Sequence, residues 1–190
     1  MRWQIISLAD VPPSPWKNGG GVTRELAVWP SAADWRWRMS VAEVASDGPF
    51  SSFEGVQRWF AVLSGAGVRL DVGQPPNACA HRLTPIGAPL KFDGELPVHC
   101  ALLDGPTQDF NLMLRGAHAS ARMRRIAGIF SCVTDMEKTI AVYSISTVAD
   151  LYFDEEVVTL PPHSLAWRTC PADTRLRVVA DHALCMEIAP

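Results

Sequence analysis

The 190-residue chain has no long apolar run, no excess of positive charge and no CxxC motif. A membrane-spanning helix needs roughly 18 to 20 consecutive apolar residues, and no segment of the chain approaches that length. The formal net charge is -3, which implies no strongly basic surface and argues against nucleic acid or an anionic membrane as the main partner. We therefore predict a protein whose partner is neither a nucleic acid nor a membrane.

The cysteines are odd in number and widely spaced. The five cysteines are typical of buried free thiols in a reducing compartment. The first ten residues, Met1 to Asp10, also lack the apolar segment and the small-residue cleavage site of a signal peptide. Both features predict a bacterial-type cytoplasmic protein.

Histidine forms no metal-binding motif in the sequence. The five histidines include no HxH or HxxxH pair, and the nearest two, His81 and His99, are 18 positions apart. Close histidine spacing is a common source of metal ligands, although ligands can also converge from distant strands. His99 and Cys100 are neighbours, but adjacent strand residues point to opposite faces and would not form a nucleophile–base pair. We predict no metal, no cofactor and no identifiable catalytic residue.

The apolar residues follow the period of strands rather than of helices. No segment keeps a 3.6-residue apolar period over three turns, and 15 prolines and 13 glycines are spread almost throughout. From Trp35 to Val41, apolar residues alternate with polar ones, and Phe110, Leu112 and Leu114 alternate in the same way. With 48% hydrophobic residues the chain can fill a core. The sequence predicts an all-β fold.

Two stretches before residue 60 combine turns with polar side chains. Trp16 to Glu25 contains three consecutive glycines and then a strand with Thr23 and Glu25 on one face. It is not a phosphate loop, because no Lys-Ser/Thr and no helix follow the glycines. Asp47 to Arg58 contains an Asp-Gly-Pro turn and ends with an arginine that opens an apolar strand. A flexible turn and an anchored loop are the structural alternatives.

The third stretch, Asp109 to Arg115, places Asp109, Asn111 and Arg115 on one face of a strand. In a closed sheet such a face lines the interior, and on an open sheet it faces solvent. Solvent is the more common surrounding for a polar strand face. The interior location is favoured only because the strands that carry Thr23, Glu25, Arg38 and Ser40 have the same pattern.

Four motifs together resemble the HutD/Ves family. They are WKNGGGVTREL, WRWRMSVAEVASDGPFSSFEGVQRWFAVLSGAGVRL, LKFDG and DFNLMLR, which fall in this order between Trp16 and Arg115. The resemblance implies a bicupin, that is, two jelly-roll β-barrels in one chain, and a bacterial cytosolic protein linked to histidine utilisation. We accordingly expect an N-terminal cupin-like barrel at residues 1–115 and a C-terminal one at 116–190. The stretch Ala119 to Ala127 carries no motif that we recognise.

The candidate site is a set of polar residues rather than a known catalytic motif. Several together could hold a carboxylate, formyl or amide group of a small metabolite by charge-assisted hydrogen bonds. The family link makes urocanate or a formylated glutamate-like compound a candidate ligand. The predicted ligand-binding residues are Asn18, Thr23, Glu25, Arg38, Ser40, Arg58, Asp109, Asn111 and Arg115.

Two other functions remain open at this stage. A hydrolase or isomerase could use Glu25 or Asp109 as a general base, because an apolar lumen raises the pKa of a carboxyl group. An interaction protein or homodimer could use tryptophans near turns, such as Trp16, Trp29 and Trp167, as anchors. For these tryptophans a place in the core is the alternative.

Overall fold

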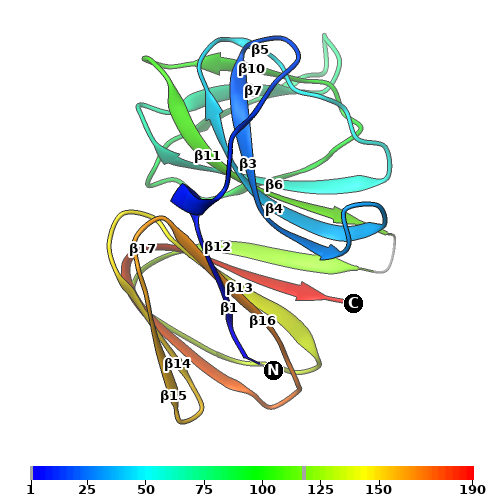
Figure 1. The fold of residues 1–190 in the computed structure, drawn as a ribbon. Helices are drawn as coiled ribbons and strands as arrows, with labels where there is room; N and C mark the ends of the chain where they lie inside the picture. Colours follow the sequence, from blue (N-terminus) through cyan, green and yellow to red (C-terminus); the bar gives the residue numbers. More distant parts are fainter. Residues whose placement is uncertain (1, 117–118) are drawn as a thin grey trace. The chain divides into compact units, whose positions relative to one another are not determined.

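The structure is a computed structural model that describes residues 2–116 and 119–190. Apart from one turn of 3-10 helix, η1 (Leu8–Asp10), the regular elements of these residues are strands (Figure 1). The all-β class predicted from the sequence is therefore confirmed. Over the same residues, no helix is both long and apolar enough to cross a membrane.

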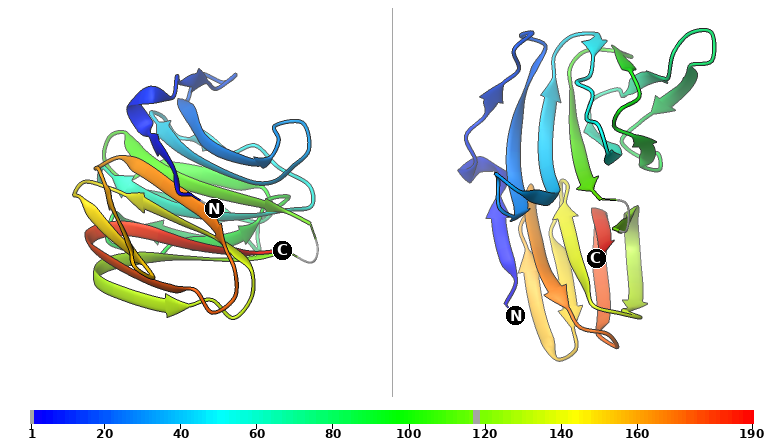
Figure 2. Two further views of the ribbon diagram at one scale, coloured as in Figure 1. Left: turned by 60° about the horizontal axis from the view of Figure 1, so that its bottom comes forward. Right: turned by 90° about the vertical axis from the view of Figure 1, so that its right-hand side faces the viewer.

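The chain folds as two compact units. One is Val11–Ala117, and the other combines Met1–Asp10 with His118–Pro190. This division differs from the predicted one, 1–115 and 116–190, chiefly at the N-terminus. The first strand, β1 (Gln4–Ser7), pairs antiparallel with β16 (Ser164–Cys170), so the blue N-terminal strand lies beside an orange one in Figure 2. No local sequence pattern predicts that this strand pairs with one so distant along the chain.

The unit Val11–Ala117 contains two antiparallel sheets. The larger has the order β2 (Ser14–Pro15), β3 (Gly21–Pro30), β4 (Trp35–Val44), β11 (Thr107–Arg115), β6 (Val56–Ser64) and β9 (Leu90–Asp93). The smaller has the order β5 (Gly48–Pro49), β10 (Val98–Leu102), β7 (Val68–Val72) and β8 (Cys79–Leu83). Apolar side chains of both sheets form one core, which consists of Val44, Phe60, Val62, Val68, Leu70, Val72, Leu83, Phe92, Val98 and Cys100.

Period-two alternation places the side chains of the larger sheet on its two faces. On β4 the residues Trp37, Met39 and Val41 are all buried, as the alternation predicts. The intervening residues of β4 point to the opposite face, the one on which the core with the smaller sheet is built. That second face also carries the polar residues of the candidate site.

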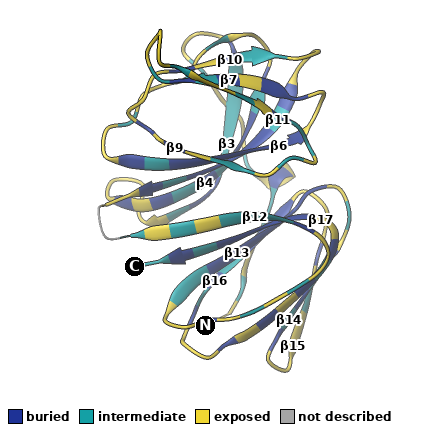
Figure 3. Cartoon of the chain, turned by 180° about the vertical axis from the view of Figure 1, so that it is seen from behind, coloured by how far each residue is buried: buried dark blue, intermediate teal, exposed yellow. Residues whose placement is uncertain are grey.

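The second unit has a single seven-stranded sheet. Its order is β1, β16, β13 (Lys138–Ser144), β17 (Arg175–Ala189), β14 (Ala149–Phe153) and β15 (Glu156–Leu160), and β12 (Ser120–Val133) pairs with β17. Its core is apolar, including Ile140, Leu151, Phe153 and Val178. Figure 3 shows this burial along β13 and β17. None of the nine predicted ligand-binding residues belongs to this unit, so the site is a property of Val11–Ala117.

Candidate functional site

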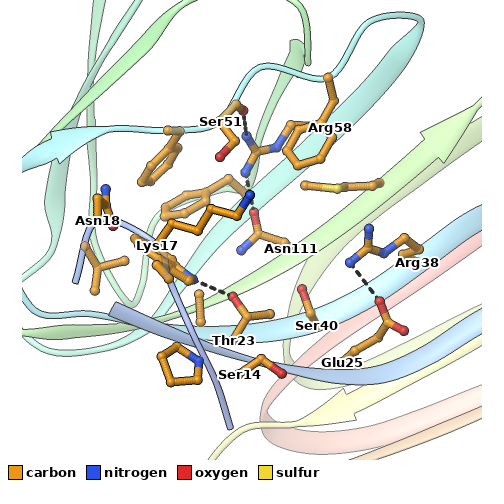
Figure 4. Close-up of a pocket in the computed structure, with 18 of the residues that line it drawn as sticks. Ser14, Lys17, Asn18, Thr23, Glu25, Arg38, Ser40, Ser51, Arg58 and Asn111 are labelled. Atoms are coloured by element: carbon orange, nitrogen blue, oxygen red, sulfur yellow. Dashed lines mark hydrogen bonds and ion pairs between the residues drawn. The ribbon is translucent and has the colours of Figure 1, made fainter. Parts of the chain in front are cut away.

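A pocket of about 780 Å³ lies against the second face of the six-stranded sheet (Figure 4). Five strands of that sheet (β2, β3, β4, β6 and β11), the segment between β2 and β3, and the segment from Pro49 to Phe53 supply its walls. The polar lining residues are Ser14, Lys17, Asn18, Thr23, Glu25, Arg38, Ser40, Ser51, Arg58 and Asn111.

Strand register explains why the polar residues meet. Asn111 on β11 lies opposite Ser40 on β4 and opposite Phe60 on β6. Ser40 in turn lies opposite Glu25 on β3. Residues directly opposite in an antiparallel pair share a face of the sheet, so these four side chains form one row across the pocket wall.

A second row runs parallel to the first. Met113 on β11 lies opposite Arg38 on β4 and opposite Arg58 on β6. The two arginines therefore reach the same pocket from strands that are separated by one strand. Long-range register, which a single sequence does not specify, brings them together.

Arg58 is the most unusual residue of the pocket. Its side chain is 6% exposed, and its guanidinium lies 5.2 to 5.7 Å from the ring centroids of Phe50, Phe53 and Phe92. Nη2 donates a hydrogen bond of 2.9 Å to Oδ1 of Asn111, and Nη1 donates one of 3.4 Å to a backbone carbonyl. Nε is buried without a hydrogen-bond partner. The buried guanidinium of Arg58 therefore retains N–H donors that no protein group uses.

No ion pair joins Arg58 to a carboxylate within residues 2–116 and 119–190. Burial lowers the pKa of its guanidinium to about 10, which still leaves the group protonated at neutral pH. A buried charge without a counter-ion is costly to a fold unless a partner supplies the missing charge. The pocket as a whole carries three cationic side chains, Lys17, Arg38 and Arg58, against one carboxylate, Glu25.

Glu25 and Arg38 form an ion pair at 2.7 Å between Oε2 and Nη2. About a third of each side chain is exposed, so the pair lies at the open side of the pocket. The Arg38 guanidinium also lies 5.3 Å from the ring centroid of Trp35. This pairing gives Glu25 a role in charge balance and leaves it poorly placed to act as a general base.

The three glycines shape a strap, residues 14–21, which folds over the edge of the sheet. Gly19 adopts φ 72°, and the strap returns so that the nitrogen of Trp16 donates to the carbonyl of Gly21 at 2.9 Å. The indole of Trp16 donates a hydrogen bond of 2.7 Å to Oγ1 of Thr23. The strap thereby carries Lys17 and Asn18 to the pocket.

Gly21 is the position where a side chain would not fit. A Cβ there would lie 2.3 Å from the carbonyl oxygen of Glu43 and 3.2 Å from the ring of Trp16. We expect Gly21→Ala to destabilise the fold by about 1–3 kcal/mol and to displace the strap, measured by thermal unfolding and carboxylate titration. Gly48→Ala is the matched control, because a Cβ at Gly48 meets no atom within 4 Å. Equal melting temperatures for the two variants would show that Gly21 is not under steric constraint.

The structure places Asp109 away from the pocket lining, although it shares a strand face with Asn111. It is 0% exposed and lies opposite Ala42 on β4 and Val62 on β6. Oδ2 accepts a hydrogen bond of 2.7 Å from Oγ1 of Thr107, and Oδ1 has no partner. Burial raises the pKa of Asp109 to about 7, and the Thr107 hydrogen bond opposes this rise.

The remaining predicted residue, Arg115, ends β11 outside the pocket lining. It is exposed, and its guanidinium lies 4.1 Å from the ring centroid of Trp35. The structure thus brings seven of the nine predicted residues to one pocket and leaves Asp109 and Arg115 outside it.

Sequence reasoning missed Lys17 and the carbonyl of Ser51. The available signal was the position of Lys17 next to Asn18, because a segment that brings Asn18 to a pocket can bring Lys17 there as well. The stretch Asp47 to Arg58, for which an anchored loop is the structural alternative, also supplies Phe50 and Phe53, whose ring centroids lie 5.4 and 5.7 Å from the guanidinium of Arg58. An arginine close to several aromatic residues was the available sequence indication.

Across the described parts of the chain, no three His, Cys, Asp or Glu side chains are grouped so that they could hold a metal ion. The donor set of the pocket is instead rich in guanidinium, ammonium, amide and hydroxyl groups. These groups bind anions and carbonyl oxygens through N–H and O–H donors.

Comparison with known proteins places the chain in a sequence family. The family model described as HutD matches residues 8–186. An uncharacterized 21.2 kDa protein in the hutC 3' region of Pseudomonas putida is 40% identical over 128 residues, which are 66% of this chain and 65% of that protein. Protein Ves of Cronobacter sakazakii is 37% identical over 122 residues, 64% of this chain and 65% of that protein. The matches thus span about two thirds of the length of these curated relatives.

Solved structures agree with the family match. HutD from Pseudomonas fluorescens SBW25, in a formate condition, has a TM-score of 0.84 and 28% identity, covering 99% of this chain and 98% of that chain. Oxalate decarboxylase of Bacillus subtilis has a TM-score of 0.63 at 9% identity, covering 97% of this chain and 76% of that chain. The second likeness concerns the fold alone, which is β-rich and cupin-like.

Proposed function

Because the chain belongs to the HutD family, we propose that its unit Val11–Ala117 binds a small metabolite carrying a carboxylate, formyl or amide group, without a metal. The observation that carries this proposal is Arg58, a buried cation with unused donors and no carboxylate partner in the described chain. A ligand carboxylate would supply the missing negative charge.

Asn111 would complete the recognition of the ligand. Its Oδ1 already accepts from Arg58, so its amide nitrogen remains to donate to a second ligand oxygen. Asn111 is itself only 6% exposed, so both donors act where water competes weakly. Lys17 extends from the strap into the pocket in Figure 4 and adds positive charge to its lining.

The family supports a place in histidine catabolism. One relative is encoded in the hutC 3' region and another is named HutD. A binding protein without its own chemistry would modulate or buffer such a pathway, and this is our reading of the chain's role. In the same proposal, the two units are the two jelly-roll barrels of a cytoplasmic bicupin.

The alternative of a hydrolase or isomerase gains little from the geometry. Of its two candidate general bases, Glu25 is paired with Arg38 and Asp109 lies outside the pocket lining. A binding role requires neither residue to accept a proton.

Isothermal titration tests the proposed function. We expect urocanate, formate or N-formylglutamate to bind the folded protein, and the methyl ester of urocanate to bind at least about tenfold more weakly than urocanate, because the ester lacks the charge that Arg58 would neutralise. Histidine tests whether the pocket tolerates an added ammonium group. Folded protein that binds none of urocanate, formate, N-formylglutamate and histidine would contradict the proposal.

A further inference from the structure

A second guanidinium faces the pocket from the same row as Arg58. Arg38 and Arg58 both lie opposite Met113, one on each neighbouring strand. Neighbouring strands are roughly 4.8 Å apart, so the two backbone positions are separated by about 10 Å. Figure 4 shows both side chains in the pocket together with Asn111.

Arg38 differs from Arg58 because it already holds a carboxylate. Glu25 pairs with it at 2.7 Å, and roughly a third of each side chain is exposed. Ion pairs of this exposure are weak, so another carboxylate can replace Glu25 at small cost. Trp35, whose ring centroid lies 5.3 Å from the guanidinium, keeps Arg38 in place during such an exchange.

The charges of the pocket allow for more than one ligand carboxylate. Three cationic side chains face a single protein carboxylate, which leaves two positive charges uncompensated. A monocarboxylate on Arg58 would neutralise only one of them. A ligand with two carboxylates would bring the net charge of the lining to zero while Glu25 stays in the pocket, and displacement of Glu25 into solvent would leave one positive charge, that of Lys17.

We infer that Arg38 is a second carboxylate subsite, that Glu25 is its built-in competitor, and that the pocket prefers short dicarboxylates to monocarboxylates. The inference rests on the proposed function, since it takes the first carboxylate to lie on Arg58. Two subsites fixed on strands of one sheet also select for the length of the ligand.

Titration of a homologous series tests this directly. Propionate is compared with malonate, succinate, glutarate and adipate by calorimetry at one ionic strength. We expect at least one dicarboxylate to bind tenfold or more tightly than propionate, with a single optimum of chain length. Arg58-dependent binding of propionate without any such preference would overturn the inference and leave the proposed function standing. Binding of none of the acids would contradict both.

Two variants then locate the second subsite. Arg38→Met should reduce the preference for the best dicarboxylate over propionate at least tenfold, because it removes the second partner. Glu25→Gln should raise that preference several-fold, because it removes the competitor. If the ion pair had a purely structural role, both variants would have a lower melting temperature and an unchanged preference for the dicarboxylate. That result would contradict the inference.

Lys17→Met is the matched control, since it also removes one positive charge from the lining. If the pocket only attracted dicarboxylates through its overall charge, Lys17→Met and Arg38→Met would reduce the preference for the best dicarboxylate over propionate equally. That result would overturn the assignment of the second subsite to Arg38. A larger loss in Arg38→Met supports it. Circular dichroism of each variant confirms that the comparison is made on folded protein.

Discussion

Arg58→Met weakens carboxylate binding by at least about 30-fold while leaving the protein folded. Loss of one partner from a buried, hydrogen-bonded charge pair costs about 2–5 kcal/mol, and each 1.4 kcal/mol is a factor of ten in affinity. Methionine fills a similar volume and suits the aromatic surroundings made by Phe50, Phe53 and Phe92. Isothermal titration of wild type and variant with the same carboxylate measures the loss.

The same substitution should not destabilise the unliganded protein. Arg58 is a buried cation without a carboxylate partner, and replacing such a group by an apolar side chain is often neutral or stabilising. We therefore expect an unchanged or higher melting temperature together with lost binding. Arg69→Met is the control, because Arg69 is exposed and pairs with Asp71 outside the pocket. Equal affinities of the Arg58→Met and wild-type proteins would remove Arg58 from the site.

Asp109→Asn should stabilise the protein at pH 8 and change its stability little at pH 4. The pKa of Asp109 is raised from 3.8 to about 7 by burial. Below pH 3.8 the carboxyl is protonated in both the folded and unfolded states, so it contributes no pH dependence. Between pH 4 and 7 the unfolded chain loses this proton while the folded protein keeps it, and stability falls as the pH rises.

Above pH 7 the loss of stability caused by Asp109 is complete. It amounts to at most about 4 kcal/mol, the free energy that corresponds to the rise in the Asp109 pKa from 3.8 to about 7. An amide cannot ionise, so the variant does not lose stability in this way as the pH rises. Its side-chain oxygen still accepts the hydrogen bond from Thr107. Urea unfolding of both proteins at pH 4 and pH 8 measures the difference, and the other carboxyl groups cancel in the comparison. Asp104→Asn, on an exposed loop, should have little effect at either pH. A stability difference between wild type and Asp109→Asn that does not change with pH would contradict a raised pKa.

Much of the site was predictable because strands impose a simple rule. Alternation alone predicts that Arg38 shares a face with Ser40, and Thr23 with Glu25. Alternation also predicts that Asp109 and Asn111 share a face, and they do. Alternation does not say which positions along a strand face the core and which face a pocket. It therefore could not show that Asp109 lies beside the core residue Val62 while Asn111 lines the pocket.

Other features depend on contacts between distant parts of the chain. The pairing of β1 with β16 joins residues some 160 positions apart, and no local pattern specifies it. The approach of Gly21 to the carbonyl of Glu43 explains one of the three glycines only once β3 and β4 are placed side by side. The same is true of Arg58 on β6, whose aromatic surroundings come from β9 and the loop after β5.

The central claim is that Arg58 holds a ligand carboxylate, and a crystal structure of the wild-type protein with the tightest-binding acid of the titrations tests it most directly. We predict carboxylate density within hydrogen-bond distance of the Arg58 guanidinium, with the amide nitrogen of Asn111 as a second donor. Density for the acid elsewhere, with Arg58 paired to a carboxylate of the protein, would contradict it.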